Sequence, residues 1–132
     1  MARTLLYLVR HGEQDPALGH STDGGLSERG RRQADRLGRR LADDVLDHAP
    51  QPDEDAVGLR AAVDHFGADS AEDRYELVVT HNFVIGWFVR HVLDAPTWRW
   101  MSLNQENCGL TIVRWDTNRP PALVCFNDIG HL

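Results

Sequence analysis

The stretch LLYLVRHGE at residues 5–13 decides the fold of this chain. Its five apolar residues in a row are too few for a helix, and their β-forming character predicts a buried strand that ends at Arg10. In open α/β sheets, ligands bind in the crevice beyond the carboxyl ends of the strands, so we expect His11 to lie at the binding position. Arg10 supplies a permanent positive charge and a fork of donors suited to phosphate or carboxylate. Gly12 lets the backbone turn and approach a ligand closely.

The stretch LVVTHN at residues 77–82 repeats this pattern of a short apolar run that ends at a histidine. If the two strands are parallel neighbours, His11, His81 and the start of the helix after Asn82 converge on one spot. Helix N-termini present free N–H groups and the positive end of a dipole, which favours an anion. The sequence therefore predicts a phosphate-binding pocket that combines two histidines, one arginine and a helix start.

The remaining elements follow from periodicity and turn residues. Ser27 is a suitable N-cap for a helix that runs to about Ala42, and helical spacing recurs over 55–66 and 83–93. Strands are expected at 110–115 and 122–126, joined by a turn-rich loop into a hairpin at one edge of the sheet. Trp98 and Trp100 are expected to pack in the core or an interface, with stacking on an aromatic substrate as the alternative.

Four blocks carry a resemblance to a known family. They are LVRHGE at 8–13, GLSERGRRQA at 25–34, VVTH at 78–81 and NCGLTI at 107–112, and together they resemble the histidine phosphatase superfamily with its phosphoglycerate mutase-like fold. The stretch from His81 through Trp100 to Asn107 is most similar to the branch that contains protein serine/threonine phosphatases. The resemblance implies one α/β domain over residues 1–132, a three-layer α/β/α sandwich with a mainly parallel sheet, helices on both faces and the C-terminal hairpin at the edge.

The resemblance and the residue chemistry agree on a mechanism. Neutral imidazole is a competent nucleophile toward phosphorus, with an ordinary pKa of about 6.5. His11 is the expected nucleophile, which forms a phosphohistidine that water then hydrolyses. Arg10 and a protonated His81 would stabilise the phosphate oxygens, and the Asn82 backbone N–H would assist at the helix start. This chemistry needs no metal and no cofactor. A metal site is not expected, because the seven histidines show no HxH or HxxxH spacing.

The middle of the chain departs from the family. Eleven of the 20 acidic residues fall between positions 43 and 76, in a segment that is shorter than the family pattern implies. The second pocket arginine of the family is not visible there, and Arg60 is the only candidate in reach. A proton donor for the leaving group could come from Glu13, Asp15 or the cluster at 53–55, and nothing in the sequence selects among them. Many family members also carry an asparagine a few residues after the RHG triplet, where this chain has Ala17 and Leu18.

Three functions remain open at this point. The first is a metal-independent phosphatase for phosphomonoesters, acting on a small molecule or a phosphoprotein. The second is a catalytically weak family member that binds phosphate or a phosphorylated partner. The third is a phosphoglycerate mutase-like phosphotransferase, which the residues at 17 and 18 disfavour.

Composition narrows the partners. The chain has 132 residues, 42% of them hydrophobic and 26% charged, which is typical of a globular protein. A net charge of -6 argues against a nucleic-acid partner, and the six arginines between 29 and 40 are expected to form a solvated helix face. No apolar run approaches the roughly 20 residues of a membrane span. We expect a cytoplasmic protein with reduced cysteines, and the sheet edge left by a lost strand is a reason to expect a homo-oligomer.

Overall fold

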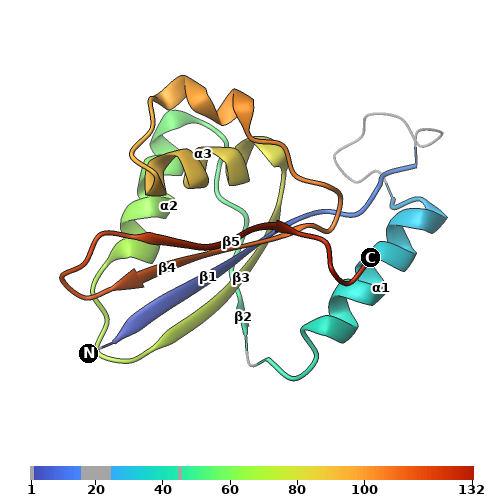
Figure 1. Ribbon diagram of the computed structural model, residues 1–132, viewed down its shortest axis with the longest axis horizontal. Coiled ribbons are helices and arrows are strands. Elements are labelled where there is room, and N and C mark those ends of the chain that lie inside the picture. Colours follow the sequence, from blue (N-terminus) through green and yellow to red (C-terminus); the bar gives the residue numbers. More distant parts are fainter. Residues whose placement is uncertain (1, 16–24, 45) are drawn as a thin grey trace.

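The computed structural model describes residues 2–15, 25–44 and 46–132, and its centre is a mixed five-stranded sheet (Figure 1). The strands are β1 (Arg3–Arg10), β2 (Asp47–His48), β3 (Arg74–Thr80), β4 (Leu110–Asp116) and β5 (Ala122–Asp128), in the order β2-β3-β1-β4-β5. β1 pairs in parallel with β3, and β3 in parallel with β2, whereas β4 is antiparallel to both β1 and β5. The predicted α/β class and the hairpin at the sheet edge are confirmed.

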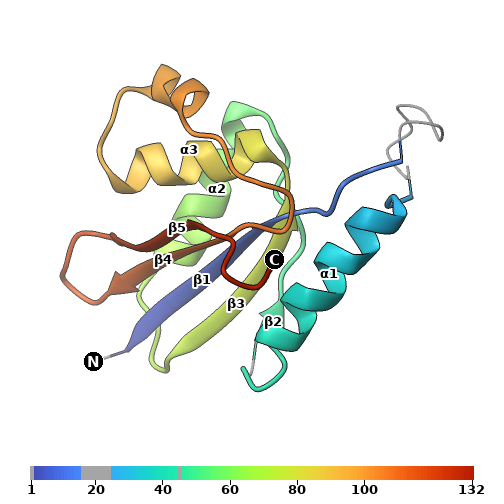
Figure 2. The ribbon, with the colours of Figure 1, turned by 45° about the vertical axis from the view of Figure 1, so that its right-hand side comes forward.

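Helices cover both faces of the sheet, as expected. α1 (Glu28–Arg40) lies on one face, and α2 (Ala56–Gly67) and α3 (Asn82–Val92) lie on the other (Figures 1 and 2). The side chains of Ser27 and Asp55 cap α1 and α2, because each accepts a hydrogen bond from a backbone N–H in the first turn. A 3₁₀ helix, Thr97–Ser102, follows α3. Within the described part of the chain, no helix is long and apolar enough to cross a membrane.

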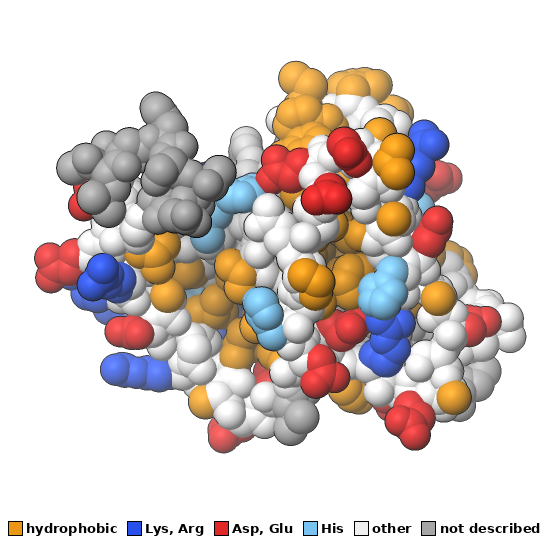
Figure 3. Space-filling view, turned by 180° about the vertical axis from the view of Figure 1, so that it is seen from behind, with side chains coloured by type: hydrophobic (Ala, Val, Ile, Leu, Met, Phe, Trp, Pro, Cys, Tyr) orange, Lys and Arg blue, Asp and Glu red, His pale blue; other side chains and the backbone are white. Residues whose placement is uncertain are grey.

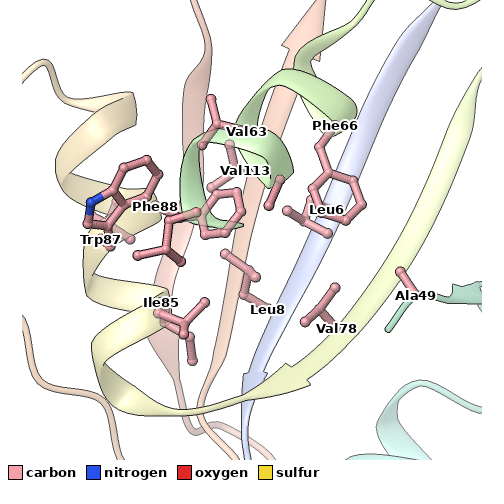
Figure 4. Packing of buried hydrophobic residues seen from close by; sticks show 14 residues of the cluster. Leu6, Leu8, Ala49, Val63, Phe66, Val78, Ile85, Trp87, Phe88 and Val113 are labelled. Carbon is pink, nitrogen blue, oxygen red and sulfur yellow. The ribbon is translucent and has the colours of Figure 1, made fainter. Parts of the chain in front are cut away.

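The main core lies between the sheet and the pair α2 and α3. Alternate side chains of β1 and β3 point to this face, and Leu6, Leu8 and Val78 are at most 1% exposed. Phe88 of α3 is fully buried among them, with the ring of Phe66 of α2 at 6.2 Å (Figure 4). The apolar residues that recur at strand and helix spacing in the sequence are therefore the ones that face this core.

The opposite face is less completely covered. α1 packs Leu37 against a small cluster that contains Val9, Cys108 and Leu110. On the same face, Val79 remains 40% exposed, although its neighbour Val78 on the other face is fully buried. The sheet is therefore well packed on one side and partly open on the other.

The two tryptophans after α3 differ in burial, and neither excludes packing at an interface. Trp100 packs edge-to-face on Phe83, with ring centroids 4.5 Å apart, but Trp98 lies on the surface with 58% of its area exposed. At the C-terminal end of the chain, His131 is partly buried, and one of its ring nitrogens lies 2.7 Å from the Cys108 carbonyl oxygen. Positions 17, 18 and 45 lie outside the described residues.

The C-terminal end of α1 is tied to the end of β5. The guanidinium of Arg40 forms an ion pair with Asp128, and His131 lies 3.0 Å from another Arg40 nitrogen. The hydrogen bond from Arg40, followed by one from the Gly130 N–H, holds the pKa of the Asp128 carboxyl well below its ordinary value. The ionised carboxylate thus helps to fix α1 on the sheet.

We expect Asp128→Asn to lower the melting temperature at pH 7. Because the pKa of Asp128 is lower in the folded state, its stabilisation is present above the ordinary carboxyl pKa of about 3.9 and is lost as the pH falls through the lowered value. The gap between wild type and variant should therefore narrow at acid pH in thermal melts. Asp69→Asn, at an exposed position, is the control, and equal melting temperatures of wild type and Asp128→Asn at pH 7 would contradict the prediction.

Candidate active site

Two histidines that are far apart in the sequence meet at the carboxyl ends of neighbouring strands. His11 follows β1 and His81 follows β3, and the parallel register places Arg10 opposite Thr80. The His11 N–H donates to the Thr80 carbonyl oxygen at 3.1 Å. The two rings are therefore adjacent, with centroids 5.0 Å apart and planes at 73°.

The ring of His11 is oriented by its own loop. Its Nδ1 lies 2.8 Å from the carbonyl oxygen of Gly12. A carbonyl can only accept, so Nδ1 carries the hydrogen and the lone pair of the neutral ring is on Nε2. The residue is partly exposed. Nε2 of His11 is thus the atom suited to attack on phosphorus.

Polar atoms without protein partners gather beside these histidines. Arg10 donates from one terminal nitrogen to the Gln105 carbonyl oxygen, which fixes its guanidinium. Among the described residues, the buried side-chain atoms without a hydrogen-bond partner are Arg10 Nε, Thr80 Oγ1, both polar atoms of the Gln105 amide and, at the far end of α3, Arg90 Nε. Buried polar atoms in native proteins are nearly always paired, so such a cluster indicates a place for a polar ligand.

The loop that follows the 3₁₀ helix holds the two histidine segments together. The Gln105 N–H donates to Asn82 Oδ1 at 2.8 Å, and Asn82 Nδ2 donates to Asn104 Oδ1 at 3.1 Å. On the other side, Asn107 Nδ2 donates to the His11 carbonyl oxygen at 3.1 Å. Sequence reasoning missed Asn104 and Gln105 as positioning residues. The only available signal was Asn107, which opens the fourth family block.

The side chain of Asn82 takes part in these loop contacts through both Oδ1 and Nδ2. Its backbone N–H lies at the first position of α3, and its expected contact with an anion through that N–H stays a prediction. His81 occupies the N-cap position of this helix, and its side chain makes no capping hydrogen bond. The free N–H groups and the helix dipole therefore point to the same end of the sheet as Arg10.

The structure separates the acidic candidates. Glu13 is tied to the helix start, because its carboxylate accepts from Ser27 Oγ at 2.9 Å and lies 3.5 Å from the Arg29 guanidinium. Asp55 caps α2. Glu54 is placed differently, with Oε1 at 3.6 Å from Nε2 of His81 and a side chain that is 46% exposed. Of these three carboxylates, Glu54 is the one beside the histidine pair.

Arg60 does not take the place of a second pocket arginine. It is exposed on α2 and lies close enough to Arg90, in the last turn of α3, that its charge adds to the effect of burial in lowering the pKa of Arg90. His81 is at the opposite end of that helix. Within the described residues there is also no group of three or more His, Cys, Asp or Glu side chains that could hold a metal ion.

Gly12 and Gly30 allow a close backbone approach between the His11 loop and α1. A Cβ added to Gly12 would lie 2.6 Å from the Gly30 carbonyl oxygen, and one added to Gly30 would lie 2.1 Å from the Glu13 carbonyl oxygen. The expectation that Gly12 lets the backbone approach a ligand stays a prediction, and the close contact that the structure shows for Gly12 is with α1. The His11 loop rests directly on the first turn of α1.

Fold and site together define an α/β protein with two histidines and an arginine at the ends of parallel strands. The chain belongs to the histidine phosphatase superfamily, because the family model of branch 1 matches residues 6–50 and 54–129. The predicted resemblance is confirmed.

Relatives and solved structures agree with this assignment. The mitochondrial serine/threonine-protein phosphatase Pgam5 of Caenorhabditis elegans is 41% identical over 64 residues, which cover 46% of this chain and 22% of that protein. The chain therefore spans about a fifth of the length of the curated relatives it matches. A phosphoserine phosphatase mutant from Entamoeba histolytica has a TM-score of 0.73 at 15% identity, covering 98% of this chain and 99% of that one. Phosphoglycerate mutase from Plasmodium falciparum has a TM-score of 0.66 at 21% identity, covering 100% and 95%. These structures establish a phosphoglycerate mutase-like fold, and the family supports phosphatase chemistry in general.

We expect Gly30→Ala to be strongly destabilising, because its Cβ would overlap the Glu13 backbone, which cannot move aside as a flexible side chain can. Gly38→Ala is the matched control in the same helix, since a Cβ there meets no atom within 4 Å and alanine favours the helix by up to about 1 kcal/mol. Urea unfolding should show a loss of about 1–3 kcal/mol or more for the first variant only. Equal stability of the two variants would disprove the close contact.

Proposed function

We propose that the chain is a metal-independent phosphatase that hydrolyses phosphomonoesters through a phosphohistidine on His11. The observation that carries this proposal is the pairing of His11, with its free Nε2, and His81 at 5.0 Å beside Arg10. Family membership supports the same reaction class. The orphaned polar atoms of Arg10 and Gln105 support a site for a polar, anionic group.

The reaction proceeds in two transfers of the phosphoryl group. In the first, Nε2 of His11 attacks phosphorus, the bond from phosphorus to the ester oxygen breaks, and the leaving alkoxide takes a proton from an acid. In the second, water attacks the phosphohistidine, the bond from phosphorus to nitrogen breaks, and phosphate leaves. Arg10, a protonated His81 and the first N–H groups of α3 stabilise the charge on the equatorial oxygens in both steps.

Glu54 is the proton donor that the geometry favours. Its carboxyl lies 3.6 Å from His81 Nε2, whereas Glu13 is held by Ser27 and Arg29. Both Glu54 and His81 are about half exposed, so a substrate can reach them. In the protonated form Glu54 would supply the proton to the leaving oxygen, and in the ionised form it would accept one from the attacking water.

The substrate class we propose is a phosphorylated serine or threonine in a protein. The support is the likeness to a serine/threonine-protein phosphatase, which is 41% identical over the matched 64 residues. A phosphoglycerate mutase-like transfer is less favoured, because the sequence lacks the family asparagine after the RHG triplet and has Ala17 and Leu18 in that neighbourhood.

We expect His11→Ala to lower hydrolysis of p-nitrophenyl phosphate by at least about a thousandfold, since the nucleophile is removed. His81→Ala should cost on the order of a hundred- to a thousandfold, as the loss of one preorganised donor does. An acid-labile phosphoenzyme trapped on denaturing gels should be absent in His11→Ala only. His48→Ala, on the exposed strand β2, is the control and should keep full activity.

The same variants separate this function from a phosphate-binding module without turnover. One observation favours that alternative. Arg60 lies near Arg90 and away from the histidine pair, so among the described residues Arg10 is the arginine beside the two histidines, and a second arginine that would stabilise the transferring phosphoryl group is not seen there. It requires that vanadate raises the melting temperature while no hydrolysis depends on His11. Measurable hydrolysis that His11→Ala abolishes excludes the alternative, and an active His11→Ala protein excludes the phosphatase mechanism.

We expect Glu54→Gln to reduce hydrolysis of an alkyl phosphate by about 10²–10⁴-fold, because an alkoxide leaving group needs protonation. Hydrolysis of p-nitrophenyl phosphate should change little, since its leaving group is stable as an anion. Glu72→Gln, an exposed residue outside the site, is the control. Steady-state kinetics with both substrates measure the ratio, and an equal loss on both would remove Glu54 from the role of acid.

A further inference from the structure

A hollow of about 320 Å³ lies beside His11, between α1 and the partly open face of the sheet. Its strand wall contains Val9, Leu77 and Val79, and its helix wall contains Leu37, Gly38 and Leu41. Hydrophobic side chains between α1 and the sheet are seen in this region of the surface in Figure 3. The lining is almost wholly carbon, so the hollow suits an apolar group.

The hollow is continuous with the candidate active site. Arg10, His11 and Gly12 line it as well, so a group held there lies next to the proposed nucleophile. Concave, mostly apolar spaces of about 300–1,000 Å³ with a few polar groups are typical of ligand sites. The occupant therefore belongs to the molecule that carries the phosphate.

Two observations indicate open space at the hollow among the described residues. A Cβ built on Gly38, which lines the hollow, meets no atom within 4 Å, so this point of α1 has room for a larger side chain. Val79, on the opposite wall, is 40% exposed, whereas Val78 on the other face is fully buried. Apolar surface of this kind gains free energy when a ligand covers it.

We propose that this hollow binds an apolar side chain of a phosphopeptide substrate, that of a residue next to or near the phosphorylated serine or threonine. The inference rests on the proposed phosphatase function and names its sequence preference. An extended peptide advances by about 3.3–3.6 Å per residue, so a side chain one or two residues from the phosphoresidue reaches the hollow while the phosphate lies at His11. In this arrangement the phosphate contacts His11, and the neighbouring apolar side chain of the peptide enters the hollow on the other side of His11.

The test is a set of phosphoserine peptides in which leucine replaces alanine at one position at a time around the phosphoserine. Wild type should show a kcat/KM that is about five- to fiftyfold higher for leucine at one position, from burial of the additional carbons. Gly38→Leu fills the hollow from the helix wall with a good helix former, and the leucine-to-alanine ratio should fall to near one. Gly38→Ala, with a single methyl, should give an intermediate ratio.

A second pair of variants guards against misfolding. Val79→Ser makes the strand wall of the hollow polar and should also lower the leucine-to-alanine ratio of kcat/KM. Val124→Ser changes a similarly exposed valine on β5, outside the hollow, and should leave that ratio unchanged. Thermal melts check that each variant is folded, and the ratio cancels any loss common to all peptides. The proposal is wrong if active wild type hydrolyses the leucine and alanine peptides with equal kcat/KM. It is also wrong if the leucine-to-alanine ratio of kcat/KM is unchanged in both Gly38→Leu and Val79→Ser.

Failure of the proposed function gives a different result. If no peptide and no p-nitrophenyl phosphate is hydrolysed, the same peptides are titrated into the protein by calorimetry. A dissociation constant that leucine lowers in wild type but not in Gly38→Leu then supports the hollow while the phosphatase function fails. If instead hexyl phosphate is hydrolysed much better than ethyl phosphate and the peptides show no leucine effect, the hollow serves small esters and the phosphopeptide proposal is wrong.

Discussion

The structure depends on the parallel pairing of β1 with β3. This pairing sets Arg10 opposite Thr80, so the two strands end level and the histidine after each one enters the same space. A shift of one strand by one residue would turn all side chains of that strand to the other face of the sheet. Burial of Leu8 in β1 and Val78 in β3 on the same face opposes the shift, because the shifted strand would lose its buried residue from the core. Packing in the core therefore fixes the distance between two side chains that lie outside it.

The two faces of the sheet serve different purposes. The face toward α2 and α3 is filled, with Phe88 completely buried, and it supplies most of the apolar burial that stabilises the fold. The face toward α1 holds a smaller cluster. Because α1 gains less from burial, contacts at its two ends matter more: the backbone approach at Gly12 and Gly30, and the ion pair of Arg40 with Asp128.

The sequence predicts those features that depend on local pattern. Apolar runs that end at His11 and His81 located the strand ends, and the structure brings both rings together. The contacts of Gln105 could not be predicted, because they exist only when a loop late in the chain reaches β1 and α3. Glu13 and Glu54 are equally plausible acids in sequence, and only the tertiary contacts of each carboxylate distinguish them.

The position of α1 connects the chemistry to the proposed selectivity. The helix rests through Gly30 on the loop that orients His11, and through Gly38 it forms one wall of the hollow. A displacement of α1 toward the sheet would narrow the hollow and press on the same loop, so neither change could occur alone. The close backbone contact at Gly30 resists such movement, because no side chain there can rotate to relieve it. The width of the hollow and the position of the His11 loop therefore both depend on α1, so the proposed substrate fit and the proposed catalysis would depend on the same element.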